Sequence, residues 1–386
     1  MSLAKTQIAL WEKVVGSTEL LDAVNMIDPT KVNEVATLRK KWSANEVSVA
    51  IELCKARESA IGRLDNAKGI VADLVSVQQA SSSAVSTWKA KRFNNAEVVD
   101  LCCGIGADLL QLPSTAVGVD CDPLRCWMAR QNSGKKVFVG DARSYGLPIT
   151  AMVHLDPSRR VENGRRLGLD EMRPNLLEVQ EICSKVCGGC VKLSPSIDLE
   201  EVAIIGDQRE VEYIEDRGRV TQGIVWFNEL ANSGCDVTAT SLTTGDTVSG
   251  SIETPRISAE IGKWIYEPNP ALERAKLHGS LGNKLDFWEP AFGLGLLCGN
   301  EQTKSNWFNV FEVLSTSVLR LEKVTSELRK LGAGEVEVKT RDSVVDPNVW
   351  QKELQKPTNV SNERLTVFAL RLGKKRVAII ARRVKQ

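Results

Sequence analysis

The segment from residue 98 to residue 108, VVDLCCGIGAD, constrains this chain more than any other. It is an apolar run that ends in Asp100, followed by Gly104 and Gly106 and then by a stretch of helical character. Glycine lets the backbone turn sharply and approach a ligand where a Cβ atom would clash. The pattern predicts a buried strand, a tight turn and a nucleotide-sized ligand at the carboxyl end of that strand.

Short apolar stretches alternate with helical stretches from residue 97 to about residue 245. This alternation is typical of a parallel sheet that is covered by helices on both faces. We expect strands at 97–101, 116–120, 136–139, 151–155, 190–193, 210–214 and 237–242, and helices at 107–111, 123–131 and 174–186, whereas 220–230 fits either type.

The regions on either side of this α/β part have other patterns. Apolar residues before residue 93 recur at helical spacing, and Ser43-Ala-Asn-Glu46 has the form of a capping box. Near the C-terminus we expect strands at 308–314, 335–339, 365–372 and 376–381, with helices at 318–331 and 347–354. The predicted domains are a helical one at 1–92, the α/β one at 93–245, a connecting segment without clear period at 246–306 and an α+β module at 307–386.

Composition narrows the class of protein. The 386 residues are 42% hydrophobic and 26% charged, as is usual for a soluble chain of several domains. No apolar run reaches the roughly 18 residues of a membrane span, and the N-terminus lacks a secretory pattern. The ten cysteines fit free thiols in a reducing compartment, and two histidines leave little material for a metal site. We expect a cytoplasmic protein without a membrane partner or a metal.

The glycine pattern, Asp-x-x-x-Gly-x-Gly, lacks the third glycine of the nicotinamide fingerprint, because Leu109 stands there. It resembles motif I of class I S-adenosylmethionine-dependent methyltransferases. Asp120 resembles the acid that accepts hydrogen bonds from the ribose hydroxyls, and Asp141 resembles the adenine-flanking acid. The resemblance implies a Rossmann-like seven-stranded domain that binds S-adenosylmethionine through Asp100, Cys102, Gly104, Gly106, Asp108, Asp120, Asp141 and Ala142.

The fourth expected strand ends in Asp156-Pro-Ser-Arg-Arg160, which resembles motif IV of the same family. The resemblance implies a substrate-facing Asp156 and a turn fixed by Pro157, with Arg159 as a third catalytic residue. Arg159 and Arg160 could hold a phosphate in bidentate fashion, and a structural ion pair with a nearby glutamate is an equal alternative.

Motif IV departs here from the form found in amine-methylating members of the family. Those members carry a second proline and an aromatic residue, which stacks a flipped base. Ser158 and Arg159 stand in their place. The motif therefore lacks the aromatic residue on which methylation of an exocyclic amine usually depends, and this disfavours that reaction. Phe93, Tyr145 or a residue of the helical domain could stack a base instead.

Cysteine chemistry is disfavoured by position. Five-carbon pyrimidine methylation needs a thiolate, and Cys190 lies at the entry of the fifth expected strand, away from its carboxyl end. Cys183-x-x-x-Cys187-x-x-Cys190 has the spacing of a radical S-adenosylmethionine iron–sulfur site. However, Cys183 and Cys187 are expected on one helix face, where small thiols pack against a sheet. His154 is expected to be buried within its strand.

Several motifs together are similar to a bacterial group of methyltransferases that end in a THUMP-like domain: GIGAD at 104–108, DPSRR at 156–160, VKLSP at 191–195 and YEPNP at 266–270. The resemblance implies a C-terminal domain that binds RNA, with transfer RNA or ribosomal RNA as the leading substrate. From Arg364 to Gln386 there are eight basic residues and no acid, which fits a polyanion or a solvated basic edge. The expected substrate-binding residues are Arg160, Lys374, Lys375 and Arg376.

The sequence therefore predicts an α/β methyltransferase that uses S-adenosylmethionine and acts on RNA. Methylation of a small molecule or of a protein is an alternative. A non-catalytic RNA-binding protein that retains the fold is another. The sequence indicates neither the modified atom nor the oligomeric state.

Overall fold

The computed structural model describes residues 3–158, 172–206, 208–355 and 363–384. They form two compact units, one of residues up to 211 together with 222–233, and the other of residues 212–221 together with those from 234 onward. The boundary passes through a hairpin of two strands, β6 (Arg209–Asp216) and β7 (Arg219–Asn228).

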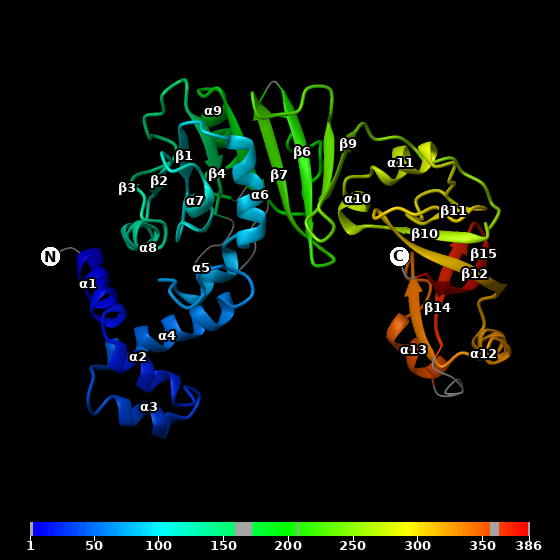
Figure 1. The fold of residues 1–386 in the computed structure, drawn as a ribbon, viewed down its shortest axis with the longest axis horizontal. Coiled ribbons are helices and arrows are strands. Elements are labelled where there is room, and N and C mark those ends of the chain that lie inside the picture. The colour runs from blue at the N-terminus through cyan, green and yellow to red at the C-terminus, as the bar shows by residue number, and fades with distance from the viewer. Residues whose placement is uncertain (1–2, 159–171, 207, 356–362, 385–386) are drawn as a thin grey trace. The chain divides into compact units, whose positions relative to one another are not determined.

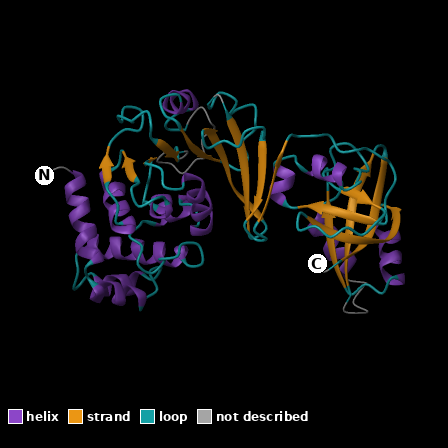
Figure 2. Cartoon of the chain, turned by 45° about the horizontal axis from the view of Figure 1, so that its top comes forward, coloured by secondary structure: helices purple, strands orange, loops and turns teal. Residues whose placement is uncertain are grey.

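The chain before its first strand folds into helices, as the sequence predicts (Figure 1 and Figure 2). They are α1 (Leu3–Val15), α2 (Thr18–Asn25), α3 (Val32–Leu38), α4 (Ala44–Ala60), α5 (Leu74–Gln79) and α6 (Ser83–Phe93). The capping box is present at the start of α4, where the Ser43 amide donates to Glu46 Oε2 at 2.9 Å and Ser43 Oγ accepts from the Glu46 amide at 3.3 Å. Trp11 and Leu53 share one hydrophobic core with Trp127, which belongs to the α/β part.

The α/β part of the first unit follows the predicted succession of elements. They are β1 (Val98–Leu101), α7 (Ala107–Gln111), β2 (Val117–Asp120), α8 (Pro123–Ser133), β3 (Val137–Val139), β4 (Met152–Leu155), α9 (Leu176–Cys183) and β5 (Gly188–Leu193). The strands lie in the order β3-β2-β1-β4-β5-β7, and all pairs are parallel except β5 with β7. The order reverses between β1 and β4, and ligands of such sheets bind outside the carboxyl ends of the strands at that point.

The second unit holds the rest of the β6–β7 hairpin, followed by β8 (Val237–Ser241) and β9 (Asp246–Gly250), with strand order β6-β8-β9. A separate sheet has the order β11-β10-β12-β15-β14-β13. Its strands are β10 (Trp264–Pro268), β11 (Leu297–Gly299), β12 (Phe308–Val318), β13 (Glu335–Thr340), β14 (Arg364–Leu372) and β15 (Lys375–Arg383), and the helices of the unit are α10 (Pro270–Arg274), α11 (His278–Lys284), α12 (Leu321–Lys330) and α13 (Pro347–Gln355).

Both faces of this separate sheet are buried in hydrophobic cores. Alternate residues of a strand point to opposite faces, so neighbouring residues of one strand belong to different cores. Val367 of β14 packs with Val324 of α12 and Leu354 of α13. Its neighbour Phe368 belongs to another core, with Trp288. The C-terminal module is therefore α+β, as the sequence predicts, and α12 and α13 pack on one face of its sheet.

Three features differ from the prediction or complete it. The segment 246–306, expected to be irregular, contains β9, β10, β11 and two helices. β9 pairs with the preceding strand β8, whereas β10 pairs with β12, which is distant along the chain, and local sequence patterns do not reveal such distant pairing. The ambiguous stretch 220–230 contains β7. Because α9 ends at Cys183, the expectation that Cys183 and Cys187 share a helix face is wrong.

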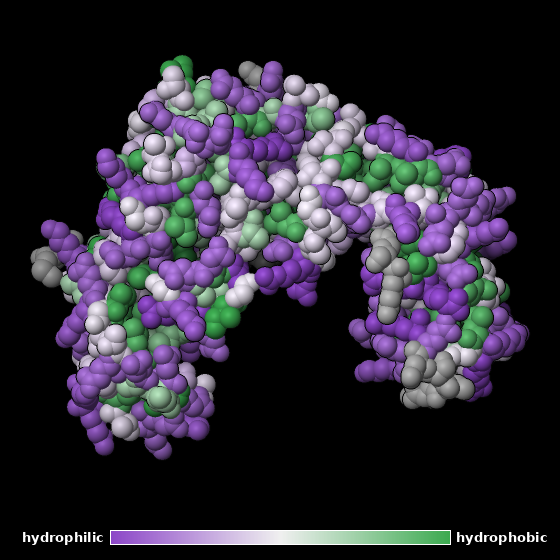
Figure 3. Space-filling view, viewed as in Figure 1, coloured by the Kyte–Doolittle hydropathy of each residue, from purple (hydrophilic) through white to green (hydrophobic). Residues whose placement is uncertain are grey.

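The described helices include none that is long and apolar enough to cross a membrane. In the space-filling view, hydrophilic side chains cover most of the visible face, and hydrophobic ones form small separate groups (Figure 3).

Candidate active site

The turn after β1 carries three alternate residues with left-handed backbone: Cys102 at a φ of 58°, Gly104 at 55° and Gly106 at 78°. A Cβ atom at Gly106 would lie 3.1 Å from Ala129 of α8, so this glycine allows close packing of the turn on the helix. A Cβ atom at Gly104 would meet no atom within 4 Å. The turn therefore has open space over Gly104, where a ligand can approach the main chain.

Asp120 ends β2 and lies beside this turn. Its Oδ2 accepts from the Gly104 amide at 2.9 Å, and its Oδ1 accepts from the Asp122 amide at 3.0 Å. Burial raises the pKa of Asp120, although the two amide hydrogen bonds oppose that shift. Each carboxylate oxygen keeps lone-pair capacity beyond one hydrogen bond, so Asp120 can also accept from ligand hydroxyls.

Asp141 and Ala142 follow β3 at the same edge. The Gly140 amide donates to the Asp120 carbonyl at 2.9 Å, which ties the two strand ends together. Asp141 Oδ1 accepts from Arg143 Nε at 2.9 Å, and hydrogen bonds from Arg143 lower the pKa of Asp141 to about 2. Ala142 is buried. Asp141 is thus near Asp120, while its carboxylate is engaged with a neighbouring guanidinium.

Asp100 lies within β1 and is fully buried. Its Oδ1 is 2.6 Å from His154 Nδ1, on the adjacent strand β4. Its Oδ2 has no hydrogen-bond partner among the described residues. Burial raises the pKa of Asp100, although the contact with His154 opposes the shift. The acid that opens the motif thus keeps one buried oxygen with unused hydrogen-bonding capacity.

Asp108 lies at the start of α7 and is also buried, but its carboxylate is fully engaged. Ser81 Oγ donates to Oδ2 at 2.7 Å and Ser86 Oγ donates to Oδ1 at 2.7 Å. Lys89 Nζ lies 2.6 Å from Oδ1. Burial alone would raise the pKa of Asp108, but Lys89 and neighbouring positive groups hold it well below its usual range. These contacts give Asp108 a supporting position beneath the turn, which differs from the direct cofactor contact predicted from the sequence.

The contacts of Lys89 fix the protonation pattern of this buried cluster. An ammonium has three hydrogens, and Lys89 Nζ lies 2.6 Å from Asp108 Oδ1, 3.2 Å from Ser81 Oγ and 3.0 Å from His154 Nε2. Because Nε2 faces an ammonium, it is the acceptor, and the ring hydrogen of His154 is on Nδ1, where it is donated to Asp100. His154 is buried, as predicted. It contacts Asp100 directly and is linked to Asp108 through Lys89.

Asp156 follows β4 at the carboxyl edge, where it contacts Lys192, a residue that was not predicted as part of the site. Lys192 Nζ, on β5, donates to Asp156 Oδ2 at 2.6 Å and to the Gln79 carbonyl oxygen at 3.1 Å. Pro157 is buried and Ser158 is exposed. Lys192 lies in the VKLSP sequence at 191–195, but a lysine in a strand gives no local sign of its partner 36 residues away.

Other predicted groups are placed elsewhere. Phe93 is buried against His154 and Trp226, so it is not available to stack a base. Tyr145 is half-buried, with its ring centroid 6.4 Å from that of Phe138. Arg159 and Arg160, together with their alternative glutamate partners, lie outside the described residues. In the described part of the chain, no three His, Cys, Asp or Glu side chains are grouped as metal ligands.

Six of the eight basic residues from Arg364 onward fall into two groups, and Arg383 donates to Asn309. Arg364 lies 3.5 Å from Glu335 and Arg382 lies 2.9 Å from Glu312, so acids on neighbouring strands balance them. By contrast, four cations at the β14–β15 turn are exposed and make no side-chain contact with a described acid: Arg371, Lys374, Lys375 and Arg376. We call these four the basic hairpin.

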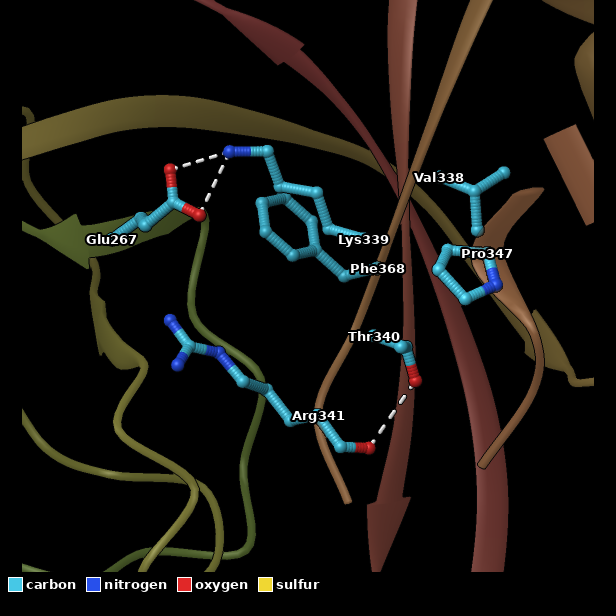
Figure 4. Close-up of a pocket in the computed structure, with 7 residues that line it drawn as sticks. All are labelled: Glu267, Val338, Lys339, Thr340, Arg341, Pro347 and Phe368. Atoms are coloured by element: carbon cyan, nitrogen blue, oxygen red, sulfur yellow. Dashed lines mark hydrogen bonds and ion pairs between the residues drawn. The ribbon is translucent and has the colours of Figure 1, made fainter. Parts of the chain in front are cut away.

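A cavity of about 310 Å³ in the second unit has a different character (Figure 4). Lys339 and Arg341 point toward it, but Lys339 Nζ lies 2.6 Å from Glu267 Oε2 and Arg341 contacts Glu273. The cavity is also lined by Val338, Thr340, Pro347 and Phe368. Its cations are balanced by acids, so it offers no charged group for an anion.

Comparison with known proteins agrees with this geometry. Residues 308–383 match the family described as THUMP domain-like. Over 289 residues the chain is 32% identical to an uncharacterized S-adenosylmethionine-dependent methyltransferase of Mycobacterium tuberculosis, found in strains CDC 1551 / Oshkosh and ATCC 25618 / H37Rv. The match covers 72% of this chain and 79% of the relative. A crystal structure of a "putative methyltransferase" from Porphyromonas gingivalis W83 has a TM-score of 0.74 at 18% identity and covers 100% of both chains.

The strand order and the glycine turn define a class I methyltransferase fold. The chain belongs to the family of S-adenosylmethionine-dependent methyltransferases and carries a C-terminal THUMP-like domain. The residues at the carboxyl edge fit that cofactor, since the turn is open over Gly104 and Asp120 stands beside it. The family assignment confirms the predicted cofactor and enzyme class.

Proposed function

We propose that this methyltransferase modifies RNA, with transfer RNA or ribosomal RNA as the acceptor. The observation that carries the proposal is the basic hairpin, because it lies within the residues that match the THUMP domain-like family. Arg371 and Arg376 stand directly opposite each other on β14 and β15. Like charges in that arrangement destabilise a sheet, so an uncompensated cluster favours a polyanionic ligand.

We further propose that the cofactor is held by the predicted edge residues other than Asp108: Asp100, Cys102, Gly104, Gly106, Asp120, Asp141 and Ala142. When bound, S-adenosylmethionine supplies a methyl group on a positively charged sulfur, which makes the group ready for displacement. Asp120 would accept the ribose hydroxyls, since its carboxylate borders the open turn. Asp108 would act from beneath, by fixing the start of α7.

In this proposal Asp156 faces the acceptor. A nitrogen or oxygen of the RNA donates its hydrogen to the free Oδ1 of Asp156, which orients the nucleophile toward the methyl carbon. The nucleophile's lone pair forms the new bond to carbon, and the electron pair of the broken carbon–sulfur bond stays on sulfur. The hydrogen leaves as a proton through the Asp156 carboxylate to water. Pro157 fixes the backbone beside that carboxylate.

A methyl-transfer assay with total RNA from a strain that lacks the gene tests the proposal. Tritiated methyl from S-adenosylmethionine should enter RNA with the wild type, and Asp156→Asn should reduce the rate by about 100-fold, since misplacement of a reacting group has effects of that order. A thermal shift with S-adenosylhomocysteine should be equal in the two proteins. Label that appears in protein or small-molecule fractions and not in RNA would contradict the proposal.

We also propose the predicted division into domains, with catalysis at 93–245 and RNA binding at 307–386. The cytoplasm is the proposed location, and all ten cysteines are free, as a reducing compartment requires.

A further inference from the structure

Lys192 is a buried lysine at the carboxyl edge, with only 6% of its surface exposed. Its ammonium is held between Asp156 Oδ2, at 2.6 Å, and the Gln79 carbonyl oxygen at the end of α5, at 3.1 Å. A buried ammonium is costly unless it is paired and hydrogen-bonded, so these two contacts fix where Nζ lies.

The acceptor of the second bond is itself held in place. Ser81, two residues beyond Gln79, gives its single hydroxyl hydrogen to Asp108 and accepts from Gln222 Nε2 at 2.7 Å. The segment that carries the Gln79 carbonyl is thus anchored to the buried cluster below the turn. Lys192 therefore has a fixed point on one side and Asp156 on the other.

The effect falls on the orientation of Asp156. Its Oδ2 is occupied by Lys192, its side chain is 29% exposed, and its Oδ1 has no hydrogen-bond partner among the described residues. A carboxylate beside an ammonium accepts hydrogen bonds and has no hydrogen to donate. The free oxygen can therefore recognise an acceptor group that carries a hydrogen, such as N–H or O–H.

We propose that Lys192 is a positioning residue, which turns Asp156 so that Oδ1 meets the N–H or O–H of the nucleophile. This inference rests on the proposed function and deepens it. It limits the acceptor to a nitrogen or an oxygen that bears hydrogen. The motif has Ser158, which is exposed, where related enzymes have a rigid proline, so the ion pair takes over the orientation of the acid.

A double-mutant cycle tests the inference in the RNA methyl-transfer assay. Lys192→Met should reduce kcat by about 100-fold, with the KM for S-adenosylmethionine changed by less than about threefold, because the effect is one of orientation at the acceptor. Lys192→Arg should recover part of the rate. Lys192→Met combined with Asp156→Asn should be no slower than Asp156→Asn alone, since Lys192 acts through that acid.

The double variant also guards against a folding defect, because it removes both charges of the buried pair together. Lys185→Met is the matched control: Lys185 makes a 2.7 Å pair with Glu181 that is exposed, and its rate should equal that of the wild type. An equal rate for Lys192→Met and wild type, or additive losses in the double variant, overturns the inference alone. If the wild type itself labels no RNA, the proposed function fails and the inference with it.

Discussion

Beneath the cofactor turn, Lys89 and Asp108 are buried 2.6 Å apart, with two serine hydroxyls completing the contacts of the acid. On the β14–β15 turn, by contrast, Lys374, Lys375 and Arg376 are exposed and make no contact with a described acid. Buried charges must be paired because water no longer solvates them. Exposed cations need no internal partner, and so they stay available for phosphate. The same residue types thus hold the fold together in one region and are free to bind a ligand in the other.

The largest effect on stability is expected for changes in the buried Lys89–Asp108 cluster. Asp108→Asn removes one partner of a buried ion pair and should lower the free energy of unfolding by about 3–5 kcal/mol at pH 7. Urea denaturation measures the loss. Lys89→Met combined with Asp108→Asn is the control, and it should be more stable than the sum of the two single changes predicts. A loss below 1 kcal/mol would show that the pair does not hold the turn.

The same variant has a defined pH dependence. The pKa of Asp108 in the folded chain lies below its ordinary value of 3.8, so its contribution to stability is fully present above that pH and declines as the pH falls further. The difference in unfolding free energy between wild type and Asp108→Asn should therefore be constant between pH 5 and 8 and should shrink below about pH 4. A difference that persists unchanged at pH 2 would contradict the assignment of the charge to Asp108.

The basic hairpin should give a smaller effect that depends on salt. Replacement of Lys374, Lys375 and Arg376 by alanine should reduce the slope of log binding constant against log salt by about 2, since each lost phosphate contact lowers it by roughly 0.7 for single strands. Filter binding of total RNA at several salt concentrations measures the slope. Arg382→Ala, which changes a paired cation on the same strand, should alter it less. Equal slopes for the wild type and both variants would show that the basic hairpin does not bind RNA.

The smallest effect is expected at Cys102, where a residue with a Cβ atom has a φ of 58°. Cys102→Gly should relieve the left-handed strain of about 1–2 kcal/mol and lose most of it again through the greater freedom of glycine in the unfolded chain. The net change should lie within about 1 kcal/mol of wild type, whereas Cys102→Val should be clearly less stable. Thermal unfolding of the two variants compares them, and equal stability would show that the backbone at this position is not strained.

The sequence revealed those parts of the site that depend on local order. The strand-end acids, the glycine turn and the alternation of strands with helices can be read along the chain, so Asp120, Asp156 and the turn were predicted at the edge where they lie. The role of Asp108 was not predicted, because Ser81, Ser86 and Lys89 reach it from the helical region. Local patterns do not show which distant side chains a fold brings together.

The same reason explains the basic tail. Its eight cations look alike along the sequence, yet Glu335 and Glu312, from other strands, balance Arg364 and Arg382. Which cations lie beside an acid depends on which strands pair, and the sequence alone does not show that pairing. Lys192 is the corresponding case at the active site, since its partner Asp156 directly follows the neighbouring strand β4.

The most direct test of the account is nucleoside mass spectrometry of RNA from a strain that lacks this gene. If RNA is the acceptor, one methylated nucleoside is lost, the wild-type gene restores it, and Asp156→Asn does not. The hairpin variant should restore it in part. An unchanged set of methylated nucleosides in the deletion strain would contradict the proposal that RNA is the acceptor.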